Sequence, residues 1–197
     1  MIKLTLFCTT LYIPDKLIEL MKELYTDTCS CVLSDGVHSE WFHVLSGVRQ
    51  GCTVAPDLFL NPMDWILNRT VEQTPMGVSI GEESFADLDY ADDVTLLAEM
   101  LETLVAGLLV LQDEAASLGL QINWSKTKVQ QVGEPRLSQA TVQVAAENVD
   151  LVDEFIYLGS VISHDGGSEA EILRRIAIAK ECFCLLEKNI WRSRIYI

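Results

Sequence analysis

Positive charge is scarce in this chain. Its 197 residues include 14 Lys and Arg against 29 Asp and Glu, so the formal net charge at pH 7 is −15. Proteins that bind nucleic acid normally neutralise phosphates with Lys and Arg. The composition therefore excludes a chain whose whole surface binds phosphate, and it leaves one basic segment near the C-terminus. That segment contains Arg174, Arg175, Lys180, Lys188, Arg192 and Arg194.

Long apolar runs are also absent. Although 49% of the residues are hydrophobic, no run approaches the ~20 residues that a membrane-spanning helix needs. The N-terminal residues 1–16 carry one early basic residue, Lys3, and no A-x-A-like end, so we expect a strand or loop there and not a signal peptide. With no targeting signal or anchor, we expect an intracellular protein, nuclear or cytoplasmic. The length suits one domain with its own core.

Histidines are few, and the cysteines lack the usual zinc spacing. Structural zinc sites normally place two to four residues between paired cysteines, whereas this chain has two C-x-C pairs, at 29–31 and 182–184. Zinc binding remains one alternative, but we interpret the six cysteines as free thiols in a reducing compartment. The three histidines have no evident nucleophile or base partner, and we expect structural or surface roles for them: His38, His43 and His164.

Hydrophobic periodicity predicts helices alternating with hairpins. In the first helix one face carries Leu17, Leu20, Met21 and Leu24. Pro62 should kink or break the second helix, and Gly119 should end the third. Ser168 and Glu171 are spaced to form a capping box that opens the last helix. The predicted helices cover residues 13–27, 56–71, 99–119 and 168–189, and strands and turns cover 29–45, 84–98, 120–132 and 140–163.

This alternation indicates the α+β class, with helices packed on one face of an antiparallel sheet. The segment 84–98 is the most unusual part, because it holds four aspartates within seven positions. Two short alternating strands would put Asp92 and Asp93 at the exposed tip of a buried hairpin. Paired carboxylates suit a hard divalent cation such as Mg²⁺, and two such ions support phosphoryl transfer. A solvated acidic turn is the alternative, since Asp is common in turns.

The sequence Tyr90-Ala91-Asp92-Asp93 resembles the catalytic hairpin of reverse transcriptases. Four further segments resemble other motifs of that family. Together with this hairpin they occur along the chain in the family's order. The ordered set spans about residues 12–195 and is most similar to the reverse transcriptases of LINE-type, non-LTR retrotransposons. The four segments are LSGVRQGCTVAPDLFLNPMDWIL, LGLQINWSKTKV, FIYLGSVISHDGG and EILRRIAIA with the later WRSR.

The resemblance implies a palm-type sheet and RNA-templated DNA synthesis by two-metal nucleotidyl transfer with Mg²⁺ or Mn²⁺. The partners it implies are an RNA template, a DNA primer and dNTPs. Asp92 and Asp93 would be the catalytic, metal-holding residues. Gln50 and Gly51 would approach the template base and the incoming nucleotide. The remaining implied positions are Tyr90 beneath the primer end, Lys126 or Lys128 near the departing pyrophosphate, and Tyr157, Leu158 and Gly159 as the primer grip.

The chain departs from the family pattern in one chemically important way. Reverse transcriptases use three catalytic aspartates, and the first lies on a strand before the helix that resembles 13–27. Residues 1–12 contain no acidic side chain. Losing one member of a catalytic unit commonly costs several orders of magnitude in rate. Two smaller departures are Ala55, where the family usually has Ser, and Pro62.

We therefore interpret residues 1–197 as a partial reverse transcriptase domain. It would consist of the palm, with 170–197 as the start of the thumb connection and with fingers and thumb largely missing. We expect it to be inactive alone. Two alternatives stay open at this stage. The first is a non-catalytic remnant that binds nucleic acid or protein, and the second is an unrelated acidic α+β domain.

Overall fold

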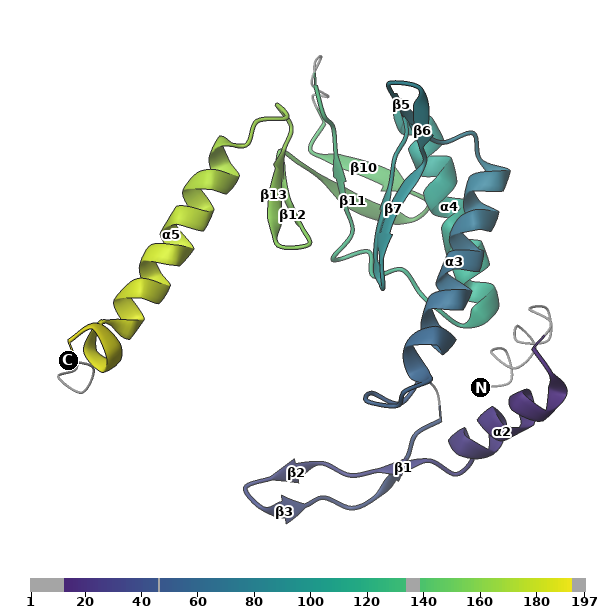
Figure 1. Cartoon of the computed structure of the whole chain (residues 1–197). Coiled ribbons are helices and arrows are strands. Elements are labelled where there is room, and N and C mark those ends of the chain that lie inside the picture. Colours follow the sequence, from purple (N-terminus) through teal and green to yellow (C-terminus); the bar gives the residue numbers. More distant parts are fainter. Residues whose placement is uncertain (1–12, 46, 134–138, 193–197) are drawn as a thin grey trace. The chain divides into compact units, whose positions relative to one another are not determined.

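The computed structural model describes residues 13–45, 47–133 and 139–192 (Figure 1). The chain divides into two compact units, Met1–Ile122 and Asn123–Ile197, and each is described by itself. The expectations for residues 1–12, including the strand that would carry a first catalytic aspartate, lie outside the described residues. No helix in the described ranges is both long enough and apolar enough to cross a membrane. The mixed α+β class is confirmed.

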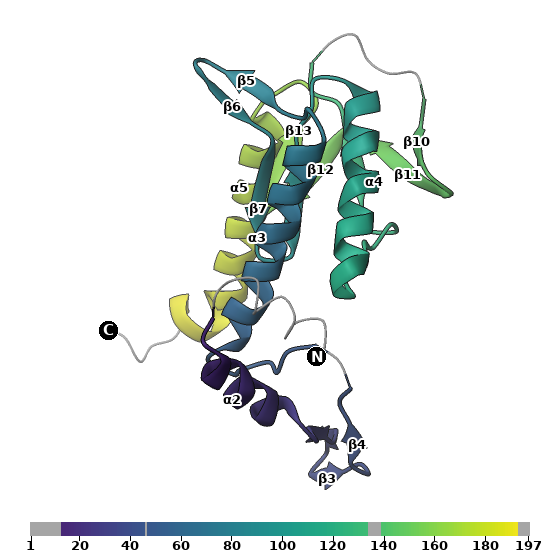
Figure 2. The same cartoon turned by 90° about the vertical axis from the view of Figure 1, so that its right-hand side faces the viewer.

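Two long helices form the core of the first unit. α3 (Ala55–Gln73) and α4 (Leu101–Leu118) lie side by side (Figures 1 and 2). Gly119 ends α4 in the left-handed conformation, with φ of 83°, as predicted. The shared cluster contains Ile66, Leu67, Leu111 and Ala115 and draws in Val94 and Leu96 from a neighbouring hairpin.

The predicted break at Pro62 is wrong. α3 runs for 19 residues through Pro62 without a gap. A proline inside a helix removes one backbone hydrogen bond and clashes with the preceding turn, at a cost of about 3 kcal/mol. Pro62 is itself buried, and Leu58 and Ile66 on either side of it are buried too. The apolar contacts of these neighbouring turns offset the lost hydrogen bond. Such contacts are not part of local helix propensity, on which the predicted break was based.

The helix α2 (Asp15–Tyr25) lies within the predicted range 13–27, and it buries only part of the predicted apolar face. Ile18 and Tyr25 pack against Leu58 at the start of α3. Of the predicted apolar face, Met21 packs against this cluster, whereas Leu17 and Leu20 are 50% and 62% exposed. The periodic leucines therefore lie on an outer surface of the described unit.

The strands of the first unit form short antiparallel hairpins. The first hairpin turns at Asp35 and Gly36, which have positive φ of 50° and 79°, the combination that a type I′ turn requires. The turn lies inside the segment 29–45, for which strands and turns were predicted. The strands are β1 (Cys29–Ser30) with β4 (Phe42–His43), β2 (Leu33–Ser34) with β3 (Val37–His38), β5 (Val78–Ile80) with β6 (Glu83–Phe85), and β7 (Asp87–Tyr90) with β8 (Asp93–Leu96).

The second unit contains a three-stranded sheet in the order β10-β11-β9 and a separate hairpin, β12–β13. The pairing of β9 with β11 is parallel, so the described strands do not form one antiparallel sheet. A parallel pair needs a crossover connection, and residues 131–146, which include β10, provide it. The strands are β9 (Lys128–Gln130), β10 (Thr141–Val144), β11 (Glu147–Val152), β12 (Glu154–Tyr157) and β13 (Ser160–Ser163).

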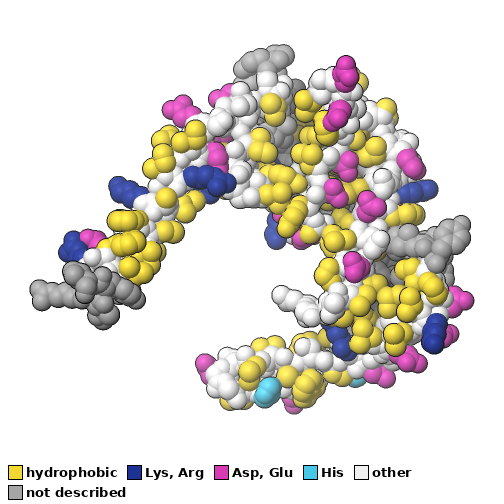
Figure 3. All heavy atoms as spheres, in the orientation of Figure 1, with side chains coloured by type: hydrophobic (Ala, Val, Ile, Leu, Met, Phe, Trp, Pro, Cys, Tyr) yellow, Lys and Arg dark blue, Asp and Glu magenta, His cyan; other side chains and the backbone are white. Residues whose placement is uncertain are grey.

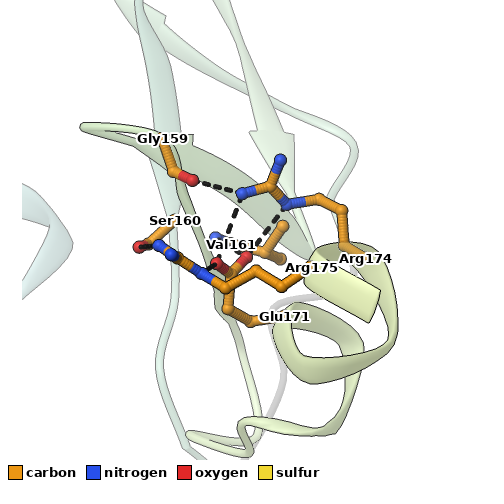
Figure 4. Close-up of polar contacts among 6 residues, drawn as sticks. All are labelled: Gly159, Ser160, Val161, Glu171, Arg174 and Arg175. Carbon is orange, nitrogen blue, oxygen red and sulfur yellow. Dashed lines mark hydrogen bonds and ion pairs between the residues drawn. The ribbon is translucent and has the colours of Figure 1, made fainter. Parts of the chain in front are cut away.

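The last helix, α5 (Glu169–Leu186), continues into the short π-helix η1 (Glu187–Trp191). The predicted capping box is wrong, because the Ser168 side chain makes no capping hydrogen bond. Glu171 has a different set of partners (Figure 4). Its carboxylate accepts the backbone N–H of Val161 at 2.8 Å and bonds to the guanidinium groups of Arg174 and Arg175.

The same two arginines reach the turn of the β12–β13 hairpin. Arg174 donates to the carbonyl oxygen of Gly159, and Arg175 Nη2 donates to Ser160 Oγ at 3.1 Å (Figure 4). Hydrogen bonds from Arg174 first, then from the Val161 N–H and Arg175, hold the pKa of Glu171 below its ordinary 4.5, at about 2. Arg174 and Arg175, two of the four arginines of the basic segment, are therefore already engaged within the chain.

We expect Glu171→Ala to free the hairpin turn and to lower the melting temperature by about 2–4 °C. A carboxylate with a depressed folded-state pKa stabilises the fold above its unfolded value, and the effect is lost as pH falls toward 2. The difference between wild type and variant should therefore close between about pH 5 and pH 2. Hydrogen exchange of the Val161 amide gives a local measurement. Glu169→Ala, on the same helix turn, is the control, and equal effects of the two changes would contradict this role.

Candidate catalytic hairpin

The β7–β8 hairpin closes through a two-residue turn. Tyr90 pairs with Asp93, which leaves Ala91 and Asp92 as the turn residues. Ala91 has a positive φ of 59°, as the first position of a type II′ turn requires, and Asp92 is not among the positive-φ residues. Both Asp92 and Asp93 are exposed. The structure thus places the two predicted carboxylates next to each other at an exposed tip.

The register divides the hairpin into two faces. Asp87 and Asp89 lie opposite Leu96 and Val94 on the face that packs toward α3 and α4. Tyr90 lies opposite Asp93 on the outer face, next to the pair Leu88 and Thr95. Tyr90 is 66% exposed, so the expectation of a buried hairpin holds for one face only. The outer face presents an aromatic ring directly beside a carboxylate.

Asp87 is the carboxyl group of this hairpin with the most altered environment. Partial burial, followed by the charges of Asp89 and of Asp64 on α3, raises the pKa of Asp87. The sequence reading did not single out this residue, because its spacing resembles no motif. Asp87 alternates with Leu88 along β7. Its side chain therefore lies on the face toward α3 and α4, and this alternation is the feature of the sequence that could have identified it.

The carboxylates at the tip of this hairpin provide some, but not all, of the ligands that a hard divalent cation needs. Among the described residues, no three His, Cys, Asp or Glu side chains are close enough together to hold a metal ion. Asp92 and Asp93 supply two adjacent exposed carboxylates. Mg²⁺ is commonly bound by one or two carboxylates together with water and substrate phosphates. The hairpin therefore fits a cation that a nucleotide helps to hold, and it does not form a complete protein cage.

Gln50 and Gly51 lie in an exposed turn just before α3. The turn is closed by the backbone N–H of Cys52, which donates to the carbonyl oxygen of Arg49 at 3.1 Å. Gly51 has φ of 85°, and a Cβ built there would meet no atom within 4 Å. Glycine is required by the backbone conformation, and the space above it is open to an approaching ligand.

The same turn contains an altered cysteine that the sequence reading treated as an ordinary free thiol. The backbone N–H of Val54, then the Tyr25 hydroxyl, lower the pKa of Cys52. Burial, then the Cys52 thiol, raise the pKa of Tyr25. The Tyr25 hydroxyl is buried and completes no hydrogen bond of ordinary geometry among the described residues. Arg49 lies over the Tyr25 ring at 5.8 Å and donates to Thr28 Oγ1 at 2.8 Å.

The other predicted residues belong to the second unit. Lys128 Nζ pairs with Asp150 Oδ2 at 2.6 Å, whereas Lys126 is exposed in a turn and makes no ion pair among the described residues. Leu158 and Gly159 form the β12–β13 turn, with φ of 48° and 78°. Their association with Asp92 and Asp93 around one substrate stays a prediction.

We expect Asp87→Asn to stabilise the chain near neutral pH, because it removes a partly buried charge beside two other carboxylates. A carboxyl with a raised folded-state pKa costs stability above that pKa, and the cost disappears below the unfolded value of about 3.9. The variant should melt higher by no more than about 2 °C at pH 7, since water screens the group. The gain should vanish near pH 3. Glu82→Gln, in an exposed turn, is the control. A gain that persists at pH 3 would contradict the electrostatic cause.

Comparisons with known proteins support the resemblance to reverse transcriptases. Residues 7–162, about four-fifths of the chain, match the family described as reverse transcriptase (RNA-dependent DNA polymerase). The Pol polyprotein of the type-1 retrotransposable element R2 from Nasonia vitripennis is 39% identical over 82 residues, which are 42% of this chain and 8% of the polyprotein.

A transposon-derived protein of Caenorhabditis elegans is 31% identical over 106 residues, which are 53% of this chain and 38% of that protein. The chain thus spans well under half the length of either relative. The alternative of an unrelated acidic α+β domain is excluded by the family match. The acidic hairpin and the preceding glycine turn are parts of a chain that belongs to the reverse transcriptase family, with relatives among retroelement proteins.

Proposed function

We propose that this chain supplies the catalytic palm of a LINE-type reverse transcriptase, which extends a DNA primer on an RNA template. The observation that carries the proposal is the turn between Tyr90 and Asp93, which presents two adjacent carboxylates to solvent in a chain of this family. Alone, such a turn is equally compatible with a solvated loop. Within the family match, nucleotidyl transfer gives a role to two adjacent carboxylates at the tip of a hairpin packed on α3 and α4.

In this proposal Asp92 and Asp93 hold Mg²⁺ or Mn²⁺. Such an ion, when bound, neutralises phosphate charge and activates a primer hydroxyl. The protein's own contribution is to fix the two carboxylates at the end of strands that are packed on α3 and α4. Tyr90, exposed beside Asp93, offers a flat surface against which the primer end packs.

Gln50 and Gly51 would position the template base and the incoming dNTP. The open space above Gly51 supports close backbone approach, and the Gln50 amide can donate and accept hydrogen bonds without adding charge. In the second unit, Lys126 would contact the departing pyrophosphate as a point charge. Lys128 is less suited, because Asp150 already neutralises it.

Tyr157, Leu158 and Gly159 would support the primer backbone. The Glu171, Arg174 and Arg175 contacts fix the turn that contains Leu158 and Gly159, and a fixed turn holds a substrate more effectively than a free one. We propose that α5 and η1 begin the connection to the thumb, which makes residues 170–197 the boundary of the palm.

A second function, a non-catalytic binding module, is favoured by one observation. No residue of α5 is buried, although it carries many large apolar side chains. Phe183 and Leu185, for example, are 59% and 69% exposed, and hydrophobic side chains run along the helix in Figure 3. A helix that is apolar on most sides is normally covered. Arg174 and Arg175 of α5 are already bonded to Glu171 and are less available to phosphates. A protein is therefore a better partner for this helix than nucleic acid.

We expect Mn²⁺ to bind the purified chain with a dissociation constant on the order of 1 mM, as weak carboxylate sites do. Loss of the free Mn²⁺ signal in electron paramagnetic resonance measures this binding. Asp92→Asn and Asp93→Asn should each weaken it about tenfold. Asp35→Asn is the matched control, because Asp35 also lies in an exposed two-residue hairpin turn. An affinity that is unchanged in both Asp92→Asn and Asp93→Asn would contradict the assigned site.

We expect the 197-residue chain alone to extend no primer on an RNA template. Residues 1–12 contain no acidic side chain, so the described hairpin contributes two carboxylates where the family chemistry uses three. Incorporation of labelled dNTP, with Asp92→Asn in parallel, is the measurement. Extension that Asp92→Asn abolishes would contradict the expected inactivity while supporting the role of Asp92.

A further inference from the structure

Two cysteine–histidine pairs lie on the hairpin of residues 29–43, which contains none of the residues proposed to bind the metal ion, the nucleotide or the primer. Cys29 Sγ is 3.3 Å from His43 Nδ1, and Cys31 Sγ is 3.3 Å from His38 Nδ1. Cys29 and His43 are directly opposed across β1 and β4. Both cysteines are free thiols. The sequence reading missed this arrangement because the histidines come close to the cysteines only when the chain folds back at Asp35 and Gly36.

The pair distances resemble one edge of a zinc tetrahedron. Zn–S and Zn–N bonds of about 2.3 Å and 2.05 Å at the tetrahedral angle separate the sulfur and nitrogen by about 3.6 Å. Each pair therefore needs to open by only about 0.3 Å to accept the ion between its two atoms. The sequence spacing is C-x-C-x₆-H-x₄-H. Its histidine spacing is usual for zinc ligands, and its cysteine spacing is one residue shorter than usual.

One chain does not complete the tetrahedron in this conformation. Among the described residues no three such ligands converge, so each pair is half of a four-ligand site. Cys29 and Cys31 are separated by one residue, so the two half-sites lie one after the other along the hairpin. The two half-sites of one copy can pair with the two half-sites of a second copy. Two-fold symmetry brings them together twice, which gives two ions for two chains.

The surface of this hairpin also indicates a covered face. Leu33, Val37 and Trp41 are 62%, 71% and 70% exposed, and hydrophobic side chains stand on its surface in Figure 3. A two-stranded hairpin without a packing partner is only marginally stable in water. Hydrophobic contacts between two copies would bury these side chains and hold the half-sites in register.

We propose that the 29–43 hairpin is a zinc-dependent self-association site, in which each Zn²⁺ is held by one cysteine–histidine pair from each of two copies. The four ligands from each chain are Cys29, Cys31, His38 and His43. Binding releases the thiol protons, because the ligand is the thiolate. The ion neutralises the two thiolates that it binds, and the imidazole Nε2–H of each histidine stays free to contact water.

The test is a Co²⁺ titration of the reduced, full 197-residue chain, followed by displacement with Zn²⁺ and by sedimentation. We expect the intense visible bands of tetrahedral cobalt with a thiolate charge-transfer band, one metal per chain, and a dimer that EDTA returns to monomer. Because the chelator experiment needs no variant, a failure to fold cannot imitate its result.

Variants then assign the ligands. Cys29→Ser, Cys31→Ser, His38→Asn and His43→Asn should each weaken metal binding at least tenfold and abolish the dimer, with unchanged far-ultraviolet circular dichroism. The double variant Cys182→Ser with Cys184→Ser, which removes the exposed C-x-C pair on α5, and His164→Asn should keep both. Octahedral cobalt, metal binding retained in the Cys29→Ser/Cys31→Ser double variant, or a monomer that holds one zinc would each overturn the proposal.

Discussion

The packing of β8 onto the α3–α4 pair is the constraint on which the candidate site depends. Val94 and Leu96 enter the cluster formed by Ile66, Leu67 and Leu111. Because side chains alternate along a strand, fixing this face inward forces Tyr90 and Asp93 outward. A slip of one residue would exchange the two faces. The hydrophobic core thus determines which carboxylates reach solvent, and the turn at Ala91 and Asp92 places them at the end of the strands.

Electrostatics follows from the same arrangement. The inward face carries Asp87 near Asp89 and Asp64, where partial burial raises its pKa, while the outward carboxylates stay in water. In the second unit the opposite situation holds, since Glu171 lies between two arginines and the Val161 N–H. The excess of acidic residues is therefore not uniform in effect. Glu171 binds two arginines, partial burial raises the pKa of Asp87, and Asp92 and Asp93 are exposed at a turn.

Local features were predictable from the sequence, because neighbouring residues determine them. Gly119 ends α4 and Asp35 with Gly36 makes the first turn, both through backbone preferences that operate over a few residues. The features that were missed depend on partners distant in sequence. Pro62 is tolerated through helix packing, Glu171 bonds ten residues back to Val161, and Cys29 meets His43 across fourteen residues. For the site, sequence motifs identified Asp92 and Asp93, but only the folded register identified Asp87.

The proposed polymerase role depends on a cation site at the outer face and tip of the β7–β8 hairpin. The most direct measurement is the Mn²⁺-induced broadening of amide signals in the ¹⁵N–¹H correlation spectrum. We expect broadening centred on Tyr90 to Val94, with the turn at Asp35 and Gly36 unaffected at the same metal concentration. Broadening of both acidic turns to the same extent, or broadening centred elsewhere, would contradict it.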